Sequence, residues 1–204
     1  MYSLIFSHNF RFRIWDFRFV LDPGATIKFD FMNVLAEFKK ITTFIFDVDG
    51  VLTDSTVLLI ENGLQARRMN IKDGLALQMA IKNGFRVMAI SGSSSDPVTQ
   101  RLKKLGIADV HMAVPDKRKF VEDHRAKNNL QWEEMLYMAD DLPDLALMKM
   151  VGLPCCPADA VPEILELSKY ISPVNGGLGC VRDVIEKVLR VQGKWVFHED
   201  IVSK

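Results

Sequence analysis

The chain has 204 residues, and its 26 basic and 26 acidic residues cancel. This balance argues against broad electrostatic binding to nucleic acid, so we expect a small-molecule function and no nucleic-acid partner. The length suits one domain with a substantial core, and the sequence has no run of about 18 apolar residues that would predict a membrane span.

Residues 1–31 differ in composition from the rest, since they hold seven of the 13 phenylalanines. Residues 10–15 alternate apolar and basic side chains, which would suit an interfacial membrane anchor or an added edge strand. We favour a third interpretation, in which this extension lies outside the fold and Met32 is the true start. The expected organisation is this extension, a main domain at 32–194 and a tail at 195–204, with no membrane partner.

From residue 41 onwards, strand and helix patterns alternate. Strands are predicted at residues 41–46, 86–90, 110–113, 135–138, 152–156 and 170–171. Helices are predicted at residues 73–84, 96–106, 117–128, 142–150, 161–167 and 180–191. This alternation predicts an α/β fold, a Rossmann-like parallel sheet with helices on both faces.

One segment departs from the alternation. Residues 57–60 and 66–70 flank Glu61-Asn62-Gly63, a hairpin signal with a turn glycine. This pattern predicts a small β-hairpin inserted between the first strand and the first helix.

Polar residues follow three of the predicted strands directly: Asp47, Ser91 and Asp140. In open parallel sheets, ligands bind beyond the carboxyl ends of the strands. We therefore expect these side chains to meet in one crevice although they lie far apart in sequence.

Asp47 and Asp49 are one residue apart at a strand end, and Gly50 allows the backbone to turn there. One carboxylate of such a pair can attack phosphorus, and the other can protonate the leaving alcohol. We expect burial beside other carboxylates to keep Asp49 protonated. Taken alone, the pair could equally be two solvated aspartates in a turn. A calcium loop is not expected, because the glutamate at its twelfth position is missing.

The later motifs are individually weaker. Ser91 and Gly92 could hold phosphate oxygens through a hydroxyl and backbone N–H groups. Lys117, at a helix start where the dipole disfavours a cation, could neutralise phosphate or simply be solvated. Three acids come after the strand at 135–138, namely Asp140, Asp141 and Asp144. They could cap a helix or complete an oxygen-ligand site for Mg²⁺.

In their order, these four motifs resemble those of haloacid dehalogenase-type phosphatases, and the similarity continues to about Lys194. The resemblance implies that Asp47 is the nucleophile and Asp49 the general acid/base. It implies that Asp47, Asp140 and the carbonyl of Asp49 hold Mg²⁺. The remaining roles it implies are phosphate binding by Ser91, Gly92 and Lys117, and support of the site by Asp141 and Asp144.

The run at residues 47–54, the hairpin and the segments 70–74 and 175–183 are similar to 3-deoxy-D-manno-octulosonate 8-phosphate phosphatases. The resemblance implies a cytoplasmic homotetramer that acts on a keto sugar acid phosphate in lipopolysaccharide synthesis. It also implies that the protein lacks a large cap domain and that residues 55–69 form the oligomer surface. The alternative activity is that of close relatives that act on nine-carbon sialic-acid phosphates and share the same layout.

Several details of this resemblance leave the substrate open. Arg67 and Arg68 could reach a neighbour's substrate carboxylate or be solvated strand residues. Ser93 and Leu178 stand where many members have arginine, and losing a bidentate anion contact bears on substrate preference. Ala139 replaces a glycine, which we expect to be tolerated.

The three cysteines, Cys155, Cys156 and Cys180, show no metal or disulfide spacing and predict reduced thiols in a cytoplasmic protein. A non-catalytic oligomerising module on the same fold is a rival hypothesis. Retention of both aspartates, the serine, the lysine and Asp140 favours the enzyme.

Overall fold

Strand β1 lies inside a six-stranded parallel sheet of order β5-β4-β1-β6-β7-β8. The computed structural model describes residues 34–196 and residue 201. The strands of the sheet are β1 (Thr43–Asp47), β4 (Arg86–Ile90), β5 (Asp109–His111), β6 (Met135–Met138), β7 (Leu153–Cys156) and β8 (Tyr170–Ile171). Because every pairing is parallel, the carboxyl ends of all six strands lie at one edge.

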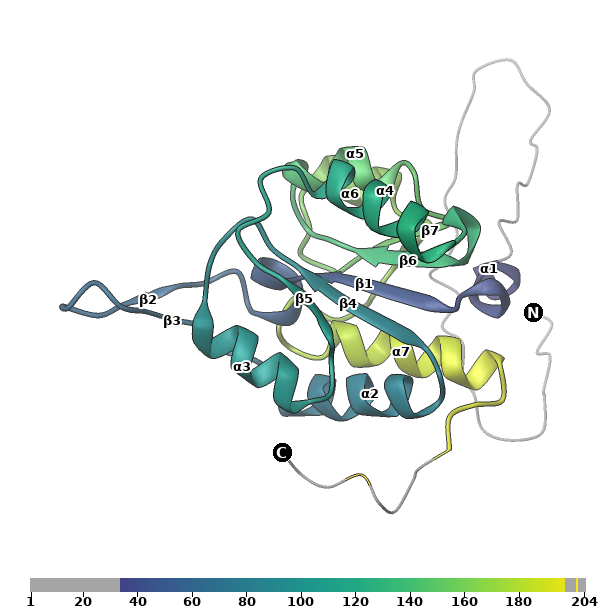
Figure 1. Cartoon of the computed structure of the whole chain (residues 1–204), viewed down its shortest axis with the longest axis horizontal. Helices are drawn as coiled ribbons and strands as arrows, with labels where there is room; N and C mark the ends of the chain where they lie inside the picture. The colour runs from purple at the N-terminus through teal and green to yellow at the C-terminus, as the bar shows by residue number, and fades with distance from the viewer. Residues whose placement is uncertain (1–33, 197–200, 202–204) are drawn as a thin grey trace, which may run out of the picture. The chain divides into compact units, whose positions relative to one another are not determined.

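Helices cover both faces of this sheet (Figure 1). One layer contains α1 (Val34–Lys40), α2 (Ile71–Lys82), α3 (Asp96–Lys104) and α7 (Cys180–Val191). The other contains α4 (Lys117–Asn128), α5 (Leu145–Met148) and α6 (Pro162–Leu167). Successive side chains of a strand point to opposite faces. Phe44 and Phe46 therefore pack in the first layer's core, whereas Ile45 packs in the second. The predicted α/β fold is confirmed.

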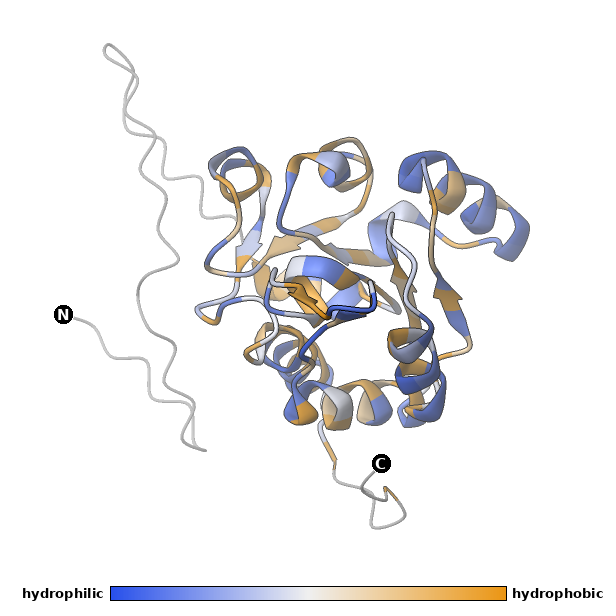
Figure 2. Cartoon of the chain, turned by 90° about the vertical axis from the view of Figure 1, so that its left-hand side faces the viewer, coloured by the Kyte–Doolittle hydropathy of each residue, from blue (hydrophilic) through white to orange (hydrophobic). Residues whose placement is uncertain are grey.

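The predicted hairpin is present but short. Strands β2 (Leu58–Leu59) and β3 (Gln65–Ala66) pair antiparallel, and Gly63 supplies a positive φ at the turn. The predicted strand at 66–70 is wrong in extent, since beyond Ala66 only Met69 makes a bridge, to Thr53. Figure 1 shows the hairpin projecting away from the sheet, and Figure 2 looks onto it and shows hydrophobic residues along part of its ribbon.

Helix α1 was not predicted from the sequence. It has seven residues, and its buried side chain is Phe38, whose ring packs edge-on against Tyr170. The Gln192 amide donates to the carbonyls of Phe38 and Ile41. Tertiary contacts from distant residues thus stabilise a helix too short to show a pattern of its own.

Two predicted helix boundaries are also wrong. Helix α2 begins after Asn70, whose side chain accepts from the Lys72 N–H at 2.8 Å, so Asp73 is not its cap. The helix predicted at 142–150 is a 3₁₀ turn, η3 (Leu142–Asp144), followed by the four-residue α5. The strand expected at 110–113 is β5, one residue earlier and shorter.

The predictions for residues 1–31 lie outside the described residues, as does most of the expected tail. The described residues from Val34 onwards belong to one compact unit, in which Trp195 packs against the core. The three cysteines are buried and form no disulfide. No described helix combines the length and the hydrophobicity that crossing a bilayer requires.

Candidate active site

Asp47 stands at the carboxyl end of the central strand β1 and is buried, with 6% of its surface exposed. Its Oδ1 accepts from the Val48 N–H at 2.7 Å and lies 2.8 Å from Lys117 Nζ. Burial and the neighbouring Asp144 raise the pKa of this carboxyl well above its usual range, although Lys117 opposes the shift. Asp47 is therefore not a solvated turn residue.

Lys117 links two carboxylates. It is the first residue of α4, and its Nζ lies 2.8 Å from both Asp47 Oδ1 and Asp144 Oδ1. Burial alone would lower the Lys117 pKa, but the two carboxylates outweigh it and raise that pKa. The side chain thus remains a cation beside Asp47.

Tyr137 completes this chain of contacts and was missed from the sequence. Its hydroxyl donates to Asp144 Oδ1 at 2.6 Å, and Asp144 is almost fully buried. A tyrosine inside a buried strand needs a partner for its hydroxyl, so its presence in β6 was the available signal. Tyr137 and Asp144 together fix the position of Lys117.

Asp140 packs against the turn η1 (Val48–Leu52) that follows β1. Gly50, in this turn, has φ +87°, and a Cβ built there would lie 1.9 Å from Asp140 Oδ2. Burial and the adjacent Asp141 raise the Asp140 pKa to about 6. Ser55, another residue the sequence did not single out, lies with its hydroxyl 3.3 Å from Asp140 Oδ2.

Asp141 itself has a local role. Its Oδ1 accepts from the Leu142 N–H at 2.7 Å and caps η3, and its side chain is exposed. Of the three acids after β6, Asp140 faces the β1 turn and Asp144 holds Lys117.

Asp49 lies among different partners from those expected. Its Oδ1 accepts from Arg67 Nε at 2.6 Å and its Oδ2 from the Ser93 hydroxyl at 2.5 Å. Its side chain is 38% exposed. Burial beside other carboxylates is therefore not its environment, and that part of the prediction is wrong. Arg68 differs from Arg67, because its side chain is 80% exposed and 3.6 Å from Asp54.

The loop after β4 brings Ser91 and Ser93 together. Ser91 is buried, its hydroxyl is 3.0 Å from that of Ser93, and it also accepts from the Ser93 N–H. Gly92 between them is exposed. Ser93, noted in the sequence only as a missing arginine, thus connects the Ser91 loop to Asp49.

The glycine-rich segment after β8 packs directly on the β1 turn. A Cβ at Gly176 would lie 2.0 Å from the Gly50 carbonyl oxygen, and the Gly177 N–H donates to the Val51 carbonyl. Leu178, which replaces a family arginine, is 56% exposed at this edge. This close approach explains why glycine is required in a segment so far along the chain.

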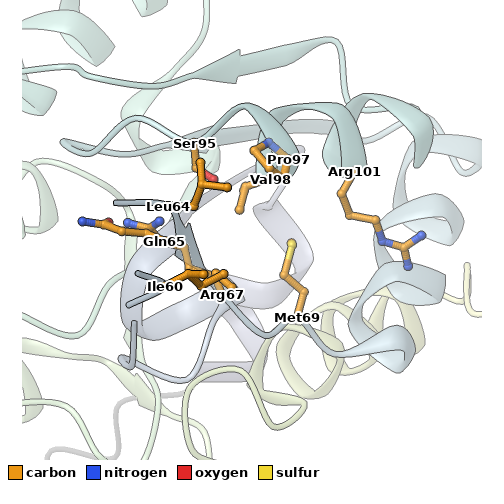
Figure 3. A pocket seen from close by; sticks show the side chains of 10 residues that line it. Ile60, Leu64, Gln65, Arg67, Met69, Ser95, Pro97, Val98 and Arg101 are labelled. Carbon is orange, nitrogen blue, oxygen red and sulfur yellow. The ribbon is translucent and has the colours of Figure 1, made fainter. Parts of the chain in front are cut away.

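A pocket of about 430 Å³ lies between the hairpin and the start of α3 (Figure 3). Arg67 lines it and also contacts Asp49, so the pocket adjoins the acidic site. Most of its other lining is apolar, contributed by Ile60, Leu64, Met69, Pro97 and Val98. Such a lining suits a hydrophobic side chain better than a hydroxyl-rich ligand.

Comparison with known proteins identifies the family. The chain is 33% identical over 162 residues to the 3-deoxy-D-manno-octulosonate 8-phosphate phosphatase KdsC of Escherichia coli K12, covering 79% of this chain and 86% of that protein. The chain belongs to the 3-deoxy-D-manno-octulosonate 8-phosphate phosphatase family. It is a phosphoric monoester hydrolase of the haloacid dehalogenase superfamily, as the motifs predicted. No family model matches the chain.

Solved structures of this phosphatase family agree with the fold. The enzyme from Yersinia pestis superposes with a TM-score of 0.77 at 31% identity, covering 79% of this chain and 87% of that one. The enzyme from Moraxella catarrhalis has the same TM-score and identity, covers 80% and 95%, and was crystallised with magnesium, phosphate and KDO. Both the fold and the family are thus established on most of the chain.

Proposed function

We propose that this phosphatase hydrolyses 3-deoxy-D-manno-octulosonate 8-phosphate, with Asp47 as the nucleophile and Mg²⁺ as the cofactor. The observation that carries the proposal is the convergence of Asp47, Lys117 and Asp140 at one edge of the sheet. Asp47 ends β1, Lys117 begins α4 and Asp140 follows β6. Because these elements are distant in sequence, local structure alone does not explain why the three side chains lie together.

The residues at this edge fit a hard cation. Asp47 and Asp140 are carboxylates whose pKa values are raised by burial, and a cation bound beside them would stabilise their ionised forms. Mg²⁺ prefers one or two carboxylates together with carbonyl, water and phosphate oxygens. Asp47, Asp140 and the backbone carbonyl of Asp49 would hold it, and when bound it offsets the repulsion between these carboxylates and an anionic phosphate.

The two aspartates divide the chemistry. A carboxylate oxygen of Asp47 attacks phosphorus, and the bond from phosphorus to the sugar oxygen breaks. That oxygen takes the proton that Asp49 carries in the substrate complex. Asp49 then takes a proton from water, whose oxygen attacks the phosphorus of the aspartyl-phosphate. Inorganic phosphate leaves and the Asp47 carboxylate is regenerated.

The surrounding side chains orient these groups. Lys117 contributes a fixed positive charge beside the nucleophile, and its contacts with Asp144 prevent it from turning away. Arg67 and Ser93 hold both oxygens of Asp49. Ser91 offers a hydroxyl to a phosphate oxygen. Positioning and charge of this kind dominate catalysis of phosphoryl transfer.

The choice of an eight-carbon keto sugar acid rests on the relatives named above, including the one crystallised with KDO. Arg67 supplies a guanidinium next to Ser93, at 3.4 Å from its hydroxyl. This guanidinium is buried and pairs with Asp49, so its role in the proposal is to position the acid/base. The proposal includes a cytoplasmic homotetramer assembled through the hairpin. The cytoplasmic location agrees with three cysteines that form no disulfide.

The test is phosphate release from a panel of sugar phosphates with Mg²⁺, comparing the wild type with Asp47→Asn. We expect turnover of the eight-carbon keto acid phosphate and a loss of at least about a thousandfold in kcat for the variant. Near-normal activity of a folded Asp47→Asn enzyme would overturn the assignment of Asp47 as the nucleophile. Preference for a nine-carbon or a neutral sugar phosphate would overturn the assignment of the eight-carbon keto acid phosphate as the substrate.

A further inference from the structure

A second cluster of side chains of the kinds that bind metals lies at the β5 edge of the sheet. It contains none of the residues assigned to catalysis. Asp109 and His111 belong to the edge strand β5 and are two residues apart, so they share one face of it. His124 comes from helix α4. One ligand atom from each of the three lies within 4.8 Å of the other two.

Two nitrogens in this cluster have no hydrogen-bond partner among the residues that the structure describes. His111 Nε2 and His124 Nε2 are buried and accept or donate no hydrogen bond within the described part of the chain. Asp109 Oδ2 is 3.9 Å from His124 Nε2, which is too long for a hydrogen bond. Burying an unsatisfied polar atom costs about 1–3 kcal/mol, so two at one place require an explanation.

Aromatic packing explains only part of the arrangement. The His111 ring lies 4.5 Å from that of Phe120, and the rings of Phe120 and His124 stack at 6.2 Å. These contacts account for the faces of the imidazoles but not for two buried Nε2 atoms without a hydrogen-bond partner among the described residues. A bound cation would satisfy all three groups.

We propose that Asp109, His111 and His124 bind a zinc ion. Two imidazole nitrogens and one carboxylate oxygen match zinc, whereas magnesium prefers oxygen ligands alone. Donors bonded to tetrahedral zinc at about 2.0 Å lie about 3.3 Å apart, so small side-chain rotations would close the site. The Asp109 side chain is 30% exposed, which leaves an approach for the ion and a place for water as the fourth ligand.

Zinc at this place would join the edge strand to the helix that carries Lys117. His111 is adjacent to the Ser91 loop, because its carbonyl accepts from the Ser91 N–H at 2.9 Å. Lys117 is the first residue of α4, two turns before His124. The ion would therefore stabilise the attachment of α4 to the sheet, and its main effect would be on thermal stability.

The experiment measures zinc binding by equilibrium dialysis at pH 7.5 in excess Mg²⁺, which occupies the catalytic carboxylates. The wild type is compared with His111→Gln, His124→Gln and the matched control Asp123→Asn, an exposed acid next to His124 that pairs with Lys119. We expect the wild type and the control to bind one more zinc ion than either histidine variant. Zinc should raise the Tm of the wild type and of Asp123→Asn by several degrees and leave the Tm of both histidine variants unchanged.

Two outcomes would overturn the proposal. One is absence of zinc binding by the wild type in excess Mg²⁺. The other is undiminished zinc binding by both histidine variants, which would locate the ion on the catalytic acids or the buried cysteines. Circular dichroism of each variant establishes that it is folded, and two independent histidine substitutions guard against failure of either one.

Discussion

At the scale of single residues, Lys117 organises the charges of the active site. Its ammonium group is held by Asp144, which is itself held by the Tyr137 hydroxyl. This chain of buried contacts delivers one fixed cation to Asp47. Removing Lys117 would leave the two buried carboxylates of Asp47 and Asp144 without their cation, so we expect this network to be costly to disturb.

Arg67 provides a prediction at this scale. Its guanidinium contacts Asp49 and lies beside Ser93, whereas the neighbouring Arg68 is exposed and 3.6 Å from Asp54. Hydrogen bonds to charged groups contribute about 1.5–3 kcal/mol, which corresponds to roughly 10- to 100-fold. We expect Arg67→Ala to lower kcat/KM by this factor in steady-state assays.

Arg68→Ala is the matched control for that measurement, because it removes the same side chain one position away. We expect it to change kcat/KM by less than about threefold, in line with the small contribution of exposed ion pairs. Equal losses for the two variants would contradict a specific role of Arg67. Rescue by Arg67→Lys would separate the need for charge from the need for the planar guanidinium.

Residue-scale prediction from the sequence worked where chemistry and strand ends coincide. Asp47, Ser91 and Asp140 could be brought together because parallel strands end at one edge. The contacts of Asp49 could not be predicted, since they depend on the hairpin folding back so that Arg67 reaches it. From the sequence alone, Ser93 indicated only the loss of an arginine contact, but the hydroxyl of its short side chain contacts Asp49.

At the scale of elements, Asp73 shows how a residue can be misread. It sits in the first turn of α2 and suggests an N-cap, yet Asn70 caps that helix. Asp73 Oδ1 instead accepts from the Arg182 N–H at the start of α7, at 2.7 Å, and Asp73 Oδ2 is buried without a partner in the described region. Asp73 therefore joins two helices rather than starting one.

This buried carboxyl predicts a pH dependence of stability. Burial raises the Asp73 pKa from 3.8 to about 6, against the opposing effect of the Arg182 N–H. Because the folded state holds the proton more tightly than the unfolded state, the free energy of unfolding falls as pH rises from about 4 to about 6. The fall attributable to Asp73 is roughly 1–3 kcal/mol.

Urea unfolding of wild type and Asp73→Asn at pH 4.5 and pH 7 measures this contribution. Asparagine keeps an acceptor for the Arg182 N–H but does not ionise, so the variant should gain stability relative to the wild type as pH rises. Asp96→Asn, at an exposed position, is the control and should show a difference that is nearly constant with pH. A constant difference for Asp73→Asn as well would refute the assignment.

Elements with a clear hydrophobic period were predicted well, and short ones were not. Helix α7 and the strands of the sheet are buried along one or both faces, which leaves a pattern in the sequence. Helices α1 and α5 have seven and four residues, too few to establish a period. Their formation depends on tertiary packing that the sequence does not display.

At the scale of the whole molecule, the hairpin is the feature that the single chain does not explain. It exposes a group of large apolar side chains, namely Val57, Leu58, Leu59, Ile60 and Leu64. Contiguous exposed apolar groups of this kind mark association sites. The adjacent pocket is lined mainly by apolar side chains and is the right kind of receptor for such residues (Figure 3).

The proposed tetramer therefore predicts a specific failure. Leu59 is 74% exposed in the hairpin, so Leu59→Asp should leave the fold of the single chain intact while placing a charge where neighbours meet. We expect the wild type to sediment as a tetramer and this variant as a smaller species, with a raised KM if a neighbour covers the site. Val196→Asp, at a position 55% exposed near the C-terminal end, is the control and should remain tetrameric. A wild type that sediments as a monomer, or a variant that sediments like the wild type, would show that the hairpin does not assemble the enzyme.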